Sequence, residues 1–257
     1  MKNGFTRPLS AIVLLPALVG LLSACATSMR TALVERHQST DCVVLLHGLN
    51  RSWRTMGKLA DSLQQDGFST ANVDYPSTTE TVEVLAPKVV NEGLRQCRQT
   101  GATRIHFVTH SLGGILLRYA YSQDPIPDLG RVVMLGPPNQ GSEVIDKTRN
   151  WPGVTMISGV AGLQLGTDED SIPSQLGPVD FELGVIAGTG TTNPMMSAML
   201  PDEDDGKVTV ARTRVEGMDD FRIVENSHFG MMKSDDVIAH TIQFLRTGRF
   251  LGESPAE

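Results

Sequence analysis

Residues 104–119 read Arg-Ile-His-Phe-Val-Thr-His-Ser-Leu-Gly-Gly-Ile-Leu-Leu-Arg-Tyr, a stretch that predicts a strand turning sharply into a helix. The β-prone residues stop before Ser111, and apolar residues at helical spacing follow it. A serine on such a turn lies at the N-terminus of a helix, where the helix dipole and a backbone N–H favour a developing negative charge. Ser111 is therefore a candidate nucleophile, and the N–H of Leu112 is a candidate donor to an oxyanion.

The five residues around this serine, Thr109-His110-Ser111-Leu112-Gly113, match the motif Gly-x-Ser-x-Gly except at its first glycine. Thr109 occupies that position, where a small residue is favoured because the turn forces the side chain against neighbouring backbone. A threonine fits there more tightly. A motif of this length is a hypothesis until its structural context is known. The alternative is an ordinary strand-to-helix turn with an incidental serine.

A second turn lies upstream. The continuous apolar run at 42–46 predicts a buried strand, and His47-Gly48-Leu49 follows it at once. Gly48 would let the backbone approach a ligand closely, and the N–H of Leu49 would then be a second donor to the oxyanion. We expect the ring of His47 to brace this loop. An ordinary loop between a strand and a helix is the alternative interpretation.

An acid and a base are expected in the second half of the chain. A strand predicted at 183–187 precedes a long loop that ends in an acidic run, and a last strand at 221–224 precedes His228. Asp205 is the preferred acid because Asp-Gly makes a tight turn that can aim a carboxylate, and Asp204 is the second choice. Of the six histidines, only His228 lies in the loop directly after the last strand, since His240 is within the predicted terminal helix, and this position supports His228 as the base. His110 adjoins Ser111, so we expect its side chain to point away from that of the serine.

These segments resemble the α/β-hydrolase superfamily and are most similar to its bacterial esterase and lipase branch. The resemblance covers roughly residues 41–250. It includes Gly-Pro-Pro-Asn-Gln-Gly-Ser at 136–142, which is similar to a Gly-x-Pro-His-x-Gly-Ser loop with Asn139 where histidine is usual. The resemblance implies five functional residues, namely the nucleophile Ser111, the base His228, the orienting acid Asp205, and the oxyanion-hole donors Leu49 and Leu112.

Predicted strands and helices alternate along the chain, which favours an α/β fold with a mostly parallel sheet and helices on both faces. We expect helices at about 53–66, 80–98 and 112–122, and a last helix between an N-cap at Ser234 and Gly248. The hydrolase domain is expected at 41–250, followed by a C-terminal tail at 251–257. Residues 143–182 break the alternation and form either a lid or cap over the site or a surface excursion with short helices.

Composition indicates one sizeable globular core, since 40% of the 257 residues are hydrophobic. The formal net charge is −7 and the sequence has no basic stripe, which argues against nucleic acid as a partner. The sequence shows no metal-ligand cluster and no phosphate-binding loop. Gly188-Thr189-Gly190 lacks the third glycine of a dinucleotide site. The expected chemistry requires no cofactor.

The N-terminus has the pattern of an export signal. Lys2 and Arg7 precede an apolar stretch at 9–24 that ends in small residues before Cys25. The pattern resembles a bacterial lipobox, which implies a lipoprotein signal peptide at 1–24, lipidation of Cys25 and a tether at 25–40. The implied location is the bacterial cell envelope, facing the periplasm, with the outer membrane favoured over the inner. An uncleaved membrane anchor is the alternative, although this stretch is short for a span and contains Pro16.

Two further cysteines, Cys42 and Cys97, would be exported with the domain. In an oxidising compartment an even pair can form a disulfide. Two buried thiols are equally compatible with the sequence, because spacing along the chain does not show whether the two Cα atoms come close.

The combined pattern predicts a serine hydrolase that cleaves carboxylic esters through an acyl-enzyme. A thioesterase or acyltransferase would use the same residues, and a non-catalytic binding protein could retain the fold. The expected partners are an acyl-ester or lipid substrate and, through Cys25, a membrane. Because a hydrophobic pocket discriminates weakly between acyl chains, we expect broad activity on short to medium esters and poor activity on peptide amides. Six apolar residues either line an acyl pocket or fill the core: Met195, Met196, Met199, Phe229, Met231 and Met232.

Overall fold

The computed structural model describes residues 40–252, in which six strands form one parallel sheet in the order β2-β1-β3-β4-β5-β6. The sheet confirms the predicted α/β fold class. Its order reverses between β1 and β3, which pair directly, and such a reversal opens a crevice at the carboxyl ends of the two strands. The strands are β1 (Asp41–Leu46), β2 (Ser69–Val73), β3 (Arg104–His110), β4 (Leu129–Leu135), β5 (Leu183–Gly188) and β6 (Asp220–Val224).

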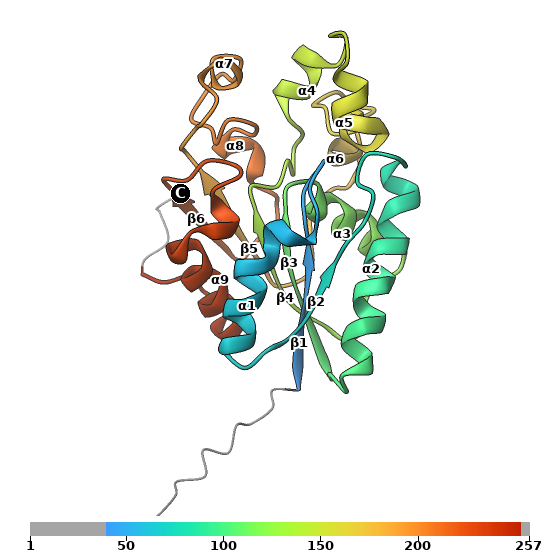
Figure 1. The fold of residues 1–257 in the computed structure, drawn as a ribbon, viewed down its shortest axis with the longest axis vertical. Helices are drawn as coiled ribbons and strands as arrows, with labels where there is room; N and C mark the ends of the chain where they lie inside the picture. Colours follow the sequence, from blue (N-terminus) through green and yellow to red (C-terminus); the bar gives the residue numbers. More distant parts are fainter. Residues whose placement is uncertain (1–39, 253–257) are drawn as a thin grey trace, which may run out of the picture. The chain divides into compact units, whose positions relative to one another are not determined.

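Helices cover both faces of the sheet (Figure 1). α1 (Gly57–Gln65) and α9 (Asp235–Thr247) lie on one face, and α2 (Val82–Gln99) and α3 (Leu112–Gln123) lie on the other. Alternate residues of β1 therefore enter different apolar clusters. Val43 and Leu45 pack with the α1 and α9 side, whereas Val44 and Leu46 pack with the α2 and α3 side. Burial on both faces explains why β1 is a continuous apolar run rather than an alternating one.

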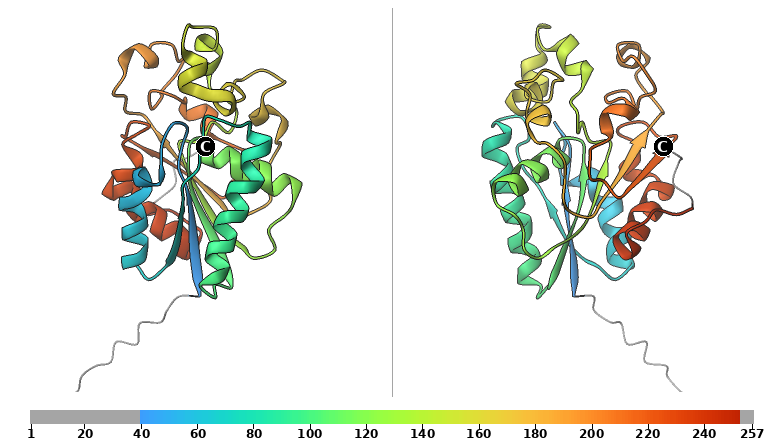
Figure 2. Two further views of the ribbon diagram at one scale, coloured as in Figure 1. Left: turned by 45° about the vertical axis from the view of Figure 1, so that its right-hand side comes forward. Right: turned by 180° about the vertical axis from the view of Figure 1, so that it is seen from behind.

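Short helices lie beyond the carboxyl ends of the strands, at the top of the molecule in Figures 1 and 2. Residues 143–182 provide three of them and contribute no strand to the sheet. Short helices are the feature that the surface-excursion interpretation of this segment predicts, and a lid or cap over the site is also compatible with them. The short helices of this edge are α4 (Glu143–Thr148), α5 (Val154–Leu163), α6 (Ile172–Gln175), α7 (Pro194–Ser197) and α8 (Val210–Thr213).

Two predicted helices differ in detail from the structure. The helix expected at 53–66 is divided into a 3₁₀ turn, η1 (Trp53–Met56), and α1. A second 3₁₀ turn, η2 (Met231–Lys233), precedes α9. Ser234 occupies the N-cap position of α9, but its side chain makes no capping hydrogen bond. Gly248 ends that helix with a φ of 78°, a left-handed conformation that glycine adopts readily.

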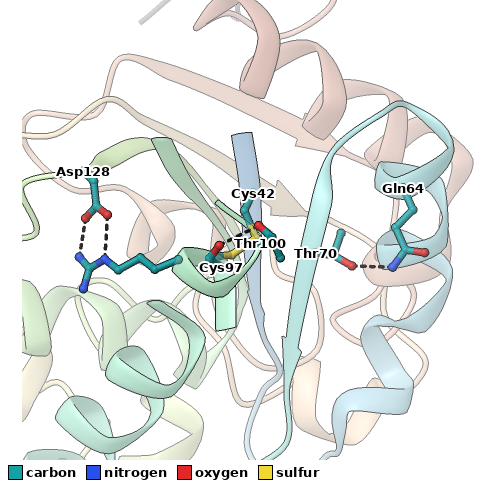
Figure 3. Close-up of a disulfide and its surroundings, with 7 residues drawn as sticks. Cys42, Gln64, Thr70, Cys97, Thr100 and Asp128 are labelled. Carbon is teal, nitrogen blue, oxygen red and sulfur yellow. Dashed lines mark hydrogen bonds and ion pairs between the residues drawn. A yellow bond between two sulfur atoms is a disulfide. The ribbon is translucent and has the colours of Figure 1, made fainter. Parts of the chain in front are cut away.

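A disulfide joins Cys42 at the start of β1 to Cys97 near the end of α2 (Figure 3), with a Cα–Cα distance of 5.6 Å. The hydroxyl of Thr100 donates to the carbonyl oxygen of Cys97 at 2.7 Å, which closes the end of the helix beside the bridge. The bridge spans 55 residues, and a loop of that length corresponds to about 4 kcal/mol of stabilisation in the chain-entropy description.

The expected signal peptide, Cys25 and most of the expected tether lie outside the described residues. Within 40–252, no helix combines the length and the apolar character that crossing a membrane requires.

Candidate active site

Ser111 occupies the turn between β3 and α3 with a φ of 52° and a ψ of −121°. A non-glycine residue with positive φ costs on the order of 1–3 kcal/mol and is maintained only when its surroundings determine it. Here the N–H of Ser111 donates to the carbonyl oxygen of Leu135 at 3.0 Å. A Cβ atom on Gly113 would lie 2.6 Å from the carbonyl oxygen of Leu46, so the second glycine of the motif is required by close packing.

Thr109, which replaces the first glycine of the motif, is completely buried. Its Oγ1 has no hydrogen-bond partner among the residues that the structure describes. A Cβ atom on Gly114 would lie only 3.3 Å from that oxygen. The turn therefore accommodates a threonine because a second glycine, one position beyond the motif, leaves space for the larger side chain.

His228 and Asp205 form a buried pair after β6 and β5. The Nδ1 of His228 lies 2.7 Å from Oδ2 of Asp205, and both residues are less than 5% exposed. The other carboxylate oxygen of Asp205 accepts the N–H groups of Lys207 at 3.0 Å and Val208 at 2.9 Å. A Cβ atom on Gly136 would lie 2.9 Å from Oδ2 of Asp205, so this glycine leaves room for the pair.

Asp204 does not contact the imidazole of His228. Its carboxylate accepts the hydroxyl of Ser197 at 2.7 Å and the N–H of Gly206 at 2.6 Å. These hydrogen bonds fix the conformation of the loop that carries Asp205. The structure therefore brings Asp205, rather than Asp204, to His228.

His110 was missed by the sequence analysis. Its Nε2 lies 2.8 Å from the carbonyl oxygen of His228, and the two rings are 4.7 Å apart. The sequence predicts only that its side chain points away from that of Ser111, and in the structure His110 lines the same cavity as the serine. Burial, with His228 close by, holds the pKa of His110 well below its usual range. A neutral His110 that donates from Nε2 fits this contact.

The loop after β1 is braced from β2. The ring of His47 stacks on that of Tyr75 with centroids 4.0 Å apart, and the Tyr75 hydroxyl donates to the carbonyl oxygen of His47. The N–H of Asn50 donates to the hydroxyl of Ser77 at 2.9 Å. A Cβ atom on Gly48 would lie 2.6 Å from Nδ1 of His110. The glycine is thus needed for packing within the protein, and not only for approach to a ligand.

Two backbone N–H groups beside Ser111 have no acceptor among the residues that the structure describes. That of Leu49 donates to none of the described residues. Leu112 is the first residue of α3, and the first N–H groups of a helix have no partner within it. Both are therefore available to a ligand oxygen.

A cavity of about 280 Å³ connects these groups, and Ser111, His228, Asp205 and Leu49 all line it. Residues 143–182 supply part of its wall through five side chains, namely Val144, Ile145, Ile157, Ser158 and Leu165. Of the six apolar residues considered for an acyl pocket, only Phe229 lines this cavity. Met231 and Met232 are buried in the core, and Met195 is 60% exposed. Leucine, isoleucine and valine form the apolar wall instead.

Comparison with known proteins identifies the family. A family model described as the alpha/beta hydrolase family matches residues 43–238. The chain belongs to this family. No curated protein matches it significantly in sequence.

Several solved structures share the fold of this α/β hydrolase. The mature lipase BlEst2 from Bacillus licheniformis is 20% identical with a TM-score of 0.63, over 81% of this chain and 91% of that one. Phospholipase PlaB from Legionella pneumophila is 18% identical with a TM-score of 0.63, over 82% and 59% of the two chains. A monoacylglycerol lipase from Paleococcus ferrophilus is 16% identical with a TM-score of 0.55, over 80% and 94%. At these identities the similarity shows the fold.

Asn139 lies outside the cavity of this α/β hydrolase and links α3 to α8. Its Oδ1 accepts from Nη1 of Arg118 at 3.1 Å, and its Nδ2 donates to the carbonyl oxygen of Thr213 at 2.8 Å. Burial lowers the pKa of Arg118 to about 10. The asparagine therefore supports a buried guanidinium. Elsewhere in 40–252, no group of three or more histidine, cysteine or acidic side chains is arranged to hold a metal ion.

Proposed function

We propose that this chain is a serine hydrolase that cleaves carboxylic esters. One observation carries the proposal: a buried His228–Asp205 pair with an Nδ1–Oδ2 distance of 2.7 Å lines the same cavity as a serine in a strained, positive-φ turn. A nucleophile, a base and a group that orients the base are the parts that acyl transfer by serine requires.

In the proposed mechanism, Ser111 Oγ attacks the ester carbonyl while Nε2 of His228 accepts its proton. Asp205 keeps the proton on Nδ1 of His228 and stabilises the imidazolium that forms. Since both carboxylate oxygens of Asp205 accept hydrogen bonds, its orientation is fixed before the substrate arrives. The N–H groups of Leu49 and Leu112 would stabilise the oxyanion of the tetrahedral intermediate.

Collapse of that intermediate breaks the ester bond, and His228 returns its proton to the leaving alcohol. The acyl group then remains on Ser111. Water, activated by the same imidazole, attacks the acyl-enzyme and regenerates the serine. An acceptor thiol or alcohol that replaced this water would convert hydrolysis into acyl transfer, so the identity of the acceptor distinguishes the two activities.

Kinetic measurements on a p-nitrophenyl butyrate substrate test the proposal. Ser111→Ala should lower kcat by about 10⁶-fold, and His228→Ala by a similar factor, because the members of a triad act as a unit. Ser62→Ala is the matched control, since the hydroxyl of this half-buried serine on α1 donates to the carbonyl oxygen of Lys58 in its own helix, outside the cavity. Turnover by Ser111→Ala close to that of Ser62→Ala would overturn the mechanism.

We also propose that the protein is a lipoprotein of the bacterial cell envelope, anchored through Cys25. The export pattern at 1–24 supports this proposal. Intact-mass measurement of the membrane-extracted protein should give a chain that begins at Cys25 and carries lipid, since more than one acyl chain is needed for stable anchoring. A soluble wild-type protein that still carries residues 1–24 would contradict it.

A further inference from the structure

The cavity beside Ser111 contains more positive than negative charge. Arg51 and Lys207 both line it, and Asp205 is the sole acidic residue of the described chain that does so. The charge of Asp205 is engaged by His228 and by two backbone N–H groups. Neither cation forms an ion pair with any carboxylate in 40–252.

Lys207 is held against the site by its backbone. Its N–H donates to Asp205 Oδ1 at 3.0 Å, and its carbonyl oxygen accepts the hydroxyl of Ser142 at 2.7 Å. Its ammonium group donates to no described residue. Burial and the neighbouring positive charge of Arg51 lower the pKa of Lys207. The neighbouring charge of Asp205 opposes this shift but does not outweigh it, and no carboxylate of the described residues forms an ion pair with either cation.

Arg51 is linked to the base through an aromatic ring. Its guanidinium is stacked over the ring of Phe229 at 4.0 Å from the centroid, and one N–H group donates to the carbonyl oxygen of Asn50 at 3.1 Å. The Phe229 ring is in turn 5.3 Å from the ring of His228. Stacking on an aromatic ring fixes the direction of the guanidinium while leaving donors available.

The position of the two cations indicates which part of a substrate they would meet. His228 delivers its proton to the oxygen of the leaving alcohol, so that alcohol lies beside His228 at the moment of bond cleavage. Arg51 is linked to His228 by the ring of Phe229, which contacts both residues. Lys207 is linked to His228 by the carboxylate of Asp205, which accepts the backbone N–H of Lys207 and contacts the imidazole. Partly buried cations that form no ion pair with a carboxylate of the described residues are stabilised by an anionic ligand.

We propose that Arg51 and Lys207 select esters whose alcohol portion carries a negatively charged group, a carboxylate or a phosphate. This inference rests on the proposed ester hydrolysis and adds the class of substrate to it. The two residues would act on binding and alignment of the leaving group, while bond cleavage stays with Ser111 and His228.

Matched esters test this selection. The acyl group is butyryl throughout, and the alcohol is 4-hydroxybenzoate, 4-hydroxyphenyl phosphate or the neutral 4-hydroxybenzamide. The readout is the ratio of kcat/KM for each anionic ester to that for the neutral ester, because comparing this ratio between variants cancels the intrinsic reactivity of the leaving groups. The proteins are the wild type, Lys207→Gln, Arg51→Gln and the control Lys88→Gln, whose lysine pairs with Glu80 on the surface.

Lys207→Gln and Arg51→Gln should each lower at least one anionic-to-neutral ratio by about tenfold or more, the size expected for one hydrogen bond to a charged group. Lys88→Gln should keep the wild-type ratios, and Lys207→Arg should recover most of the loss. If the ratio for the carboxylate ester falls more than that for the phosphate ester, the site selects carboxylated alcohols. The reverse order assigns it to phosphorylated alcohols. Ratios within about twofold of wild type in both Gln variants would overturn the proposal.

Binding separates this inference from the proposed chemistry. If the wild type hydrolyses none of the esters, the proposed function fails, and calorimetric titration with the free alcohols still tests the cation pair. The two anionic alcohols should bind at least about tenfold more tightly than 4-hydroxybenzamide, and Lys207→Gln should remove the difference. Equal affinity of wild type for all three alcohols would contradict the assignment even if ester hydrolysis is observed.

Discussion

The Nε2 atom of His110 lies 2.8 Å from the main-chain carbonyl oxygen of His228, so the residue before the candidate nucleophile holds the backbone of the candidate base. This contact joins the end of β3 to the loop after β6, two strands that are not neighbours in the sheet. It gives His110 a positioning role that is separate from proton transfer.

Removal of this hydrogen bond should impair kcat more than KM. We expect His110→Leu to lower kcat by about 10–100-fold, because small displacements of a catalytic group have effects of this order. His110→Gln, whose side-chain amide can place a donor near the position of Nε2, should recover part of the rate. Steady-state kinetics and circular dichroism on both variants provide the test. Equal kcat values for the Leu and Gln variants would argue for a purely structural role.

Buried histidines should make folding stability depend on pH. Burial lowers the pKa values of His47 and His110 below 6.5. The unfolded chain therefore binds protons below about pH 6.5 that the folded chain does not, and the free energy of unfolding decreases as the pH falls. The loss should approach about 1.4 kcal/mol per pH unit for each histidine.

Urea unfolding at about pH 7.5 and about pH 5.5 measures this dependence. His110→Asn should reduce the difference between the two values, since it removes one of the groups that titrate. A wild-type protein that is equally stable at both values would contradict the neutral, buried state of these histidines.

Thr109→Val should stabilise the protein by about 1 kcal/mol, because it replaces an oxygen that has no partner in the described structure with a methyl group of similar size. Thr213→Val is the matched control. The hydroxyl of Thr213, also buried, donates to the carbonyl oxygen of Val210 at 2.7 Å, so its removal should destabilise. Thermal unfolding of both variants gives the comparison, and a lower Tm for Thr109→Val would refute this interpretation.

Asn139→Ala should lower the free energy of unfolding by about 2–3 kcal/mol, because the guanidinium of Arg118 would lose a buried acceptor. Gln140→Ala, at the exposed neighbouring position, should cost about 0.5 kcal/mol or less. Equilibrium unfolding in urea separates the two effects. Similar losses in both variants would show that the contact with Arg118 contributes little.

Much of this structure is predictable from sequence because its signals are local. The apolar run at 42–46 and the β-prone residues at 104–109 predict strands, and the Asp-Gly pair singles out Asp205 from its acidic neighbours. Strong local patterns of this kind reflect burial on both faces of the sheet and turn geometry, and both can be recognised without knowing which distant segments pack against them.

The features that the sequence did not indicate all depend on contacts between distant segments. Adjacency to Ser111 predicts that the His110 side chain points away from that of the serine, but it does not predict the contact between His110 and the backbone of His228. That contact forms where Ser111, with its φ of 52°, turns the chain at the end of β3. The two cations beside His228 are more than 150 residues apart in sequence. Arg51 and Lys207 come to one cavity only when the strands before them assemble into the same sheet.

The central claim is that Ser111 is activated by His228 and Asp205, and covalent labelling with a fluorophosphonate tests it most directly. Mass spectrometry of the labelled protein should locate the adduct on the peptide that contains Ser111, and Ser111→Ala should remove it. Asp205→Asn should slow labelling by about 10⁴-fold, in line with loss of the orienting acid of a triad, whereas Asp204→Asn should slow it far less. An adduct on another residue, or equal labelling rates for the two Asn variants, would contradict the account.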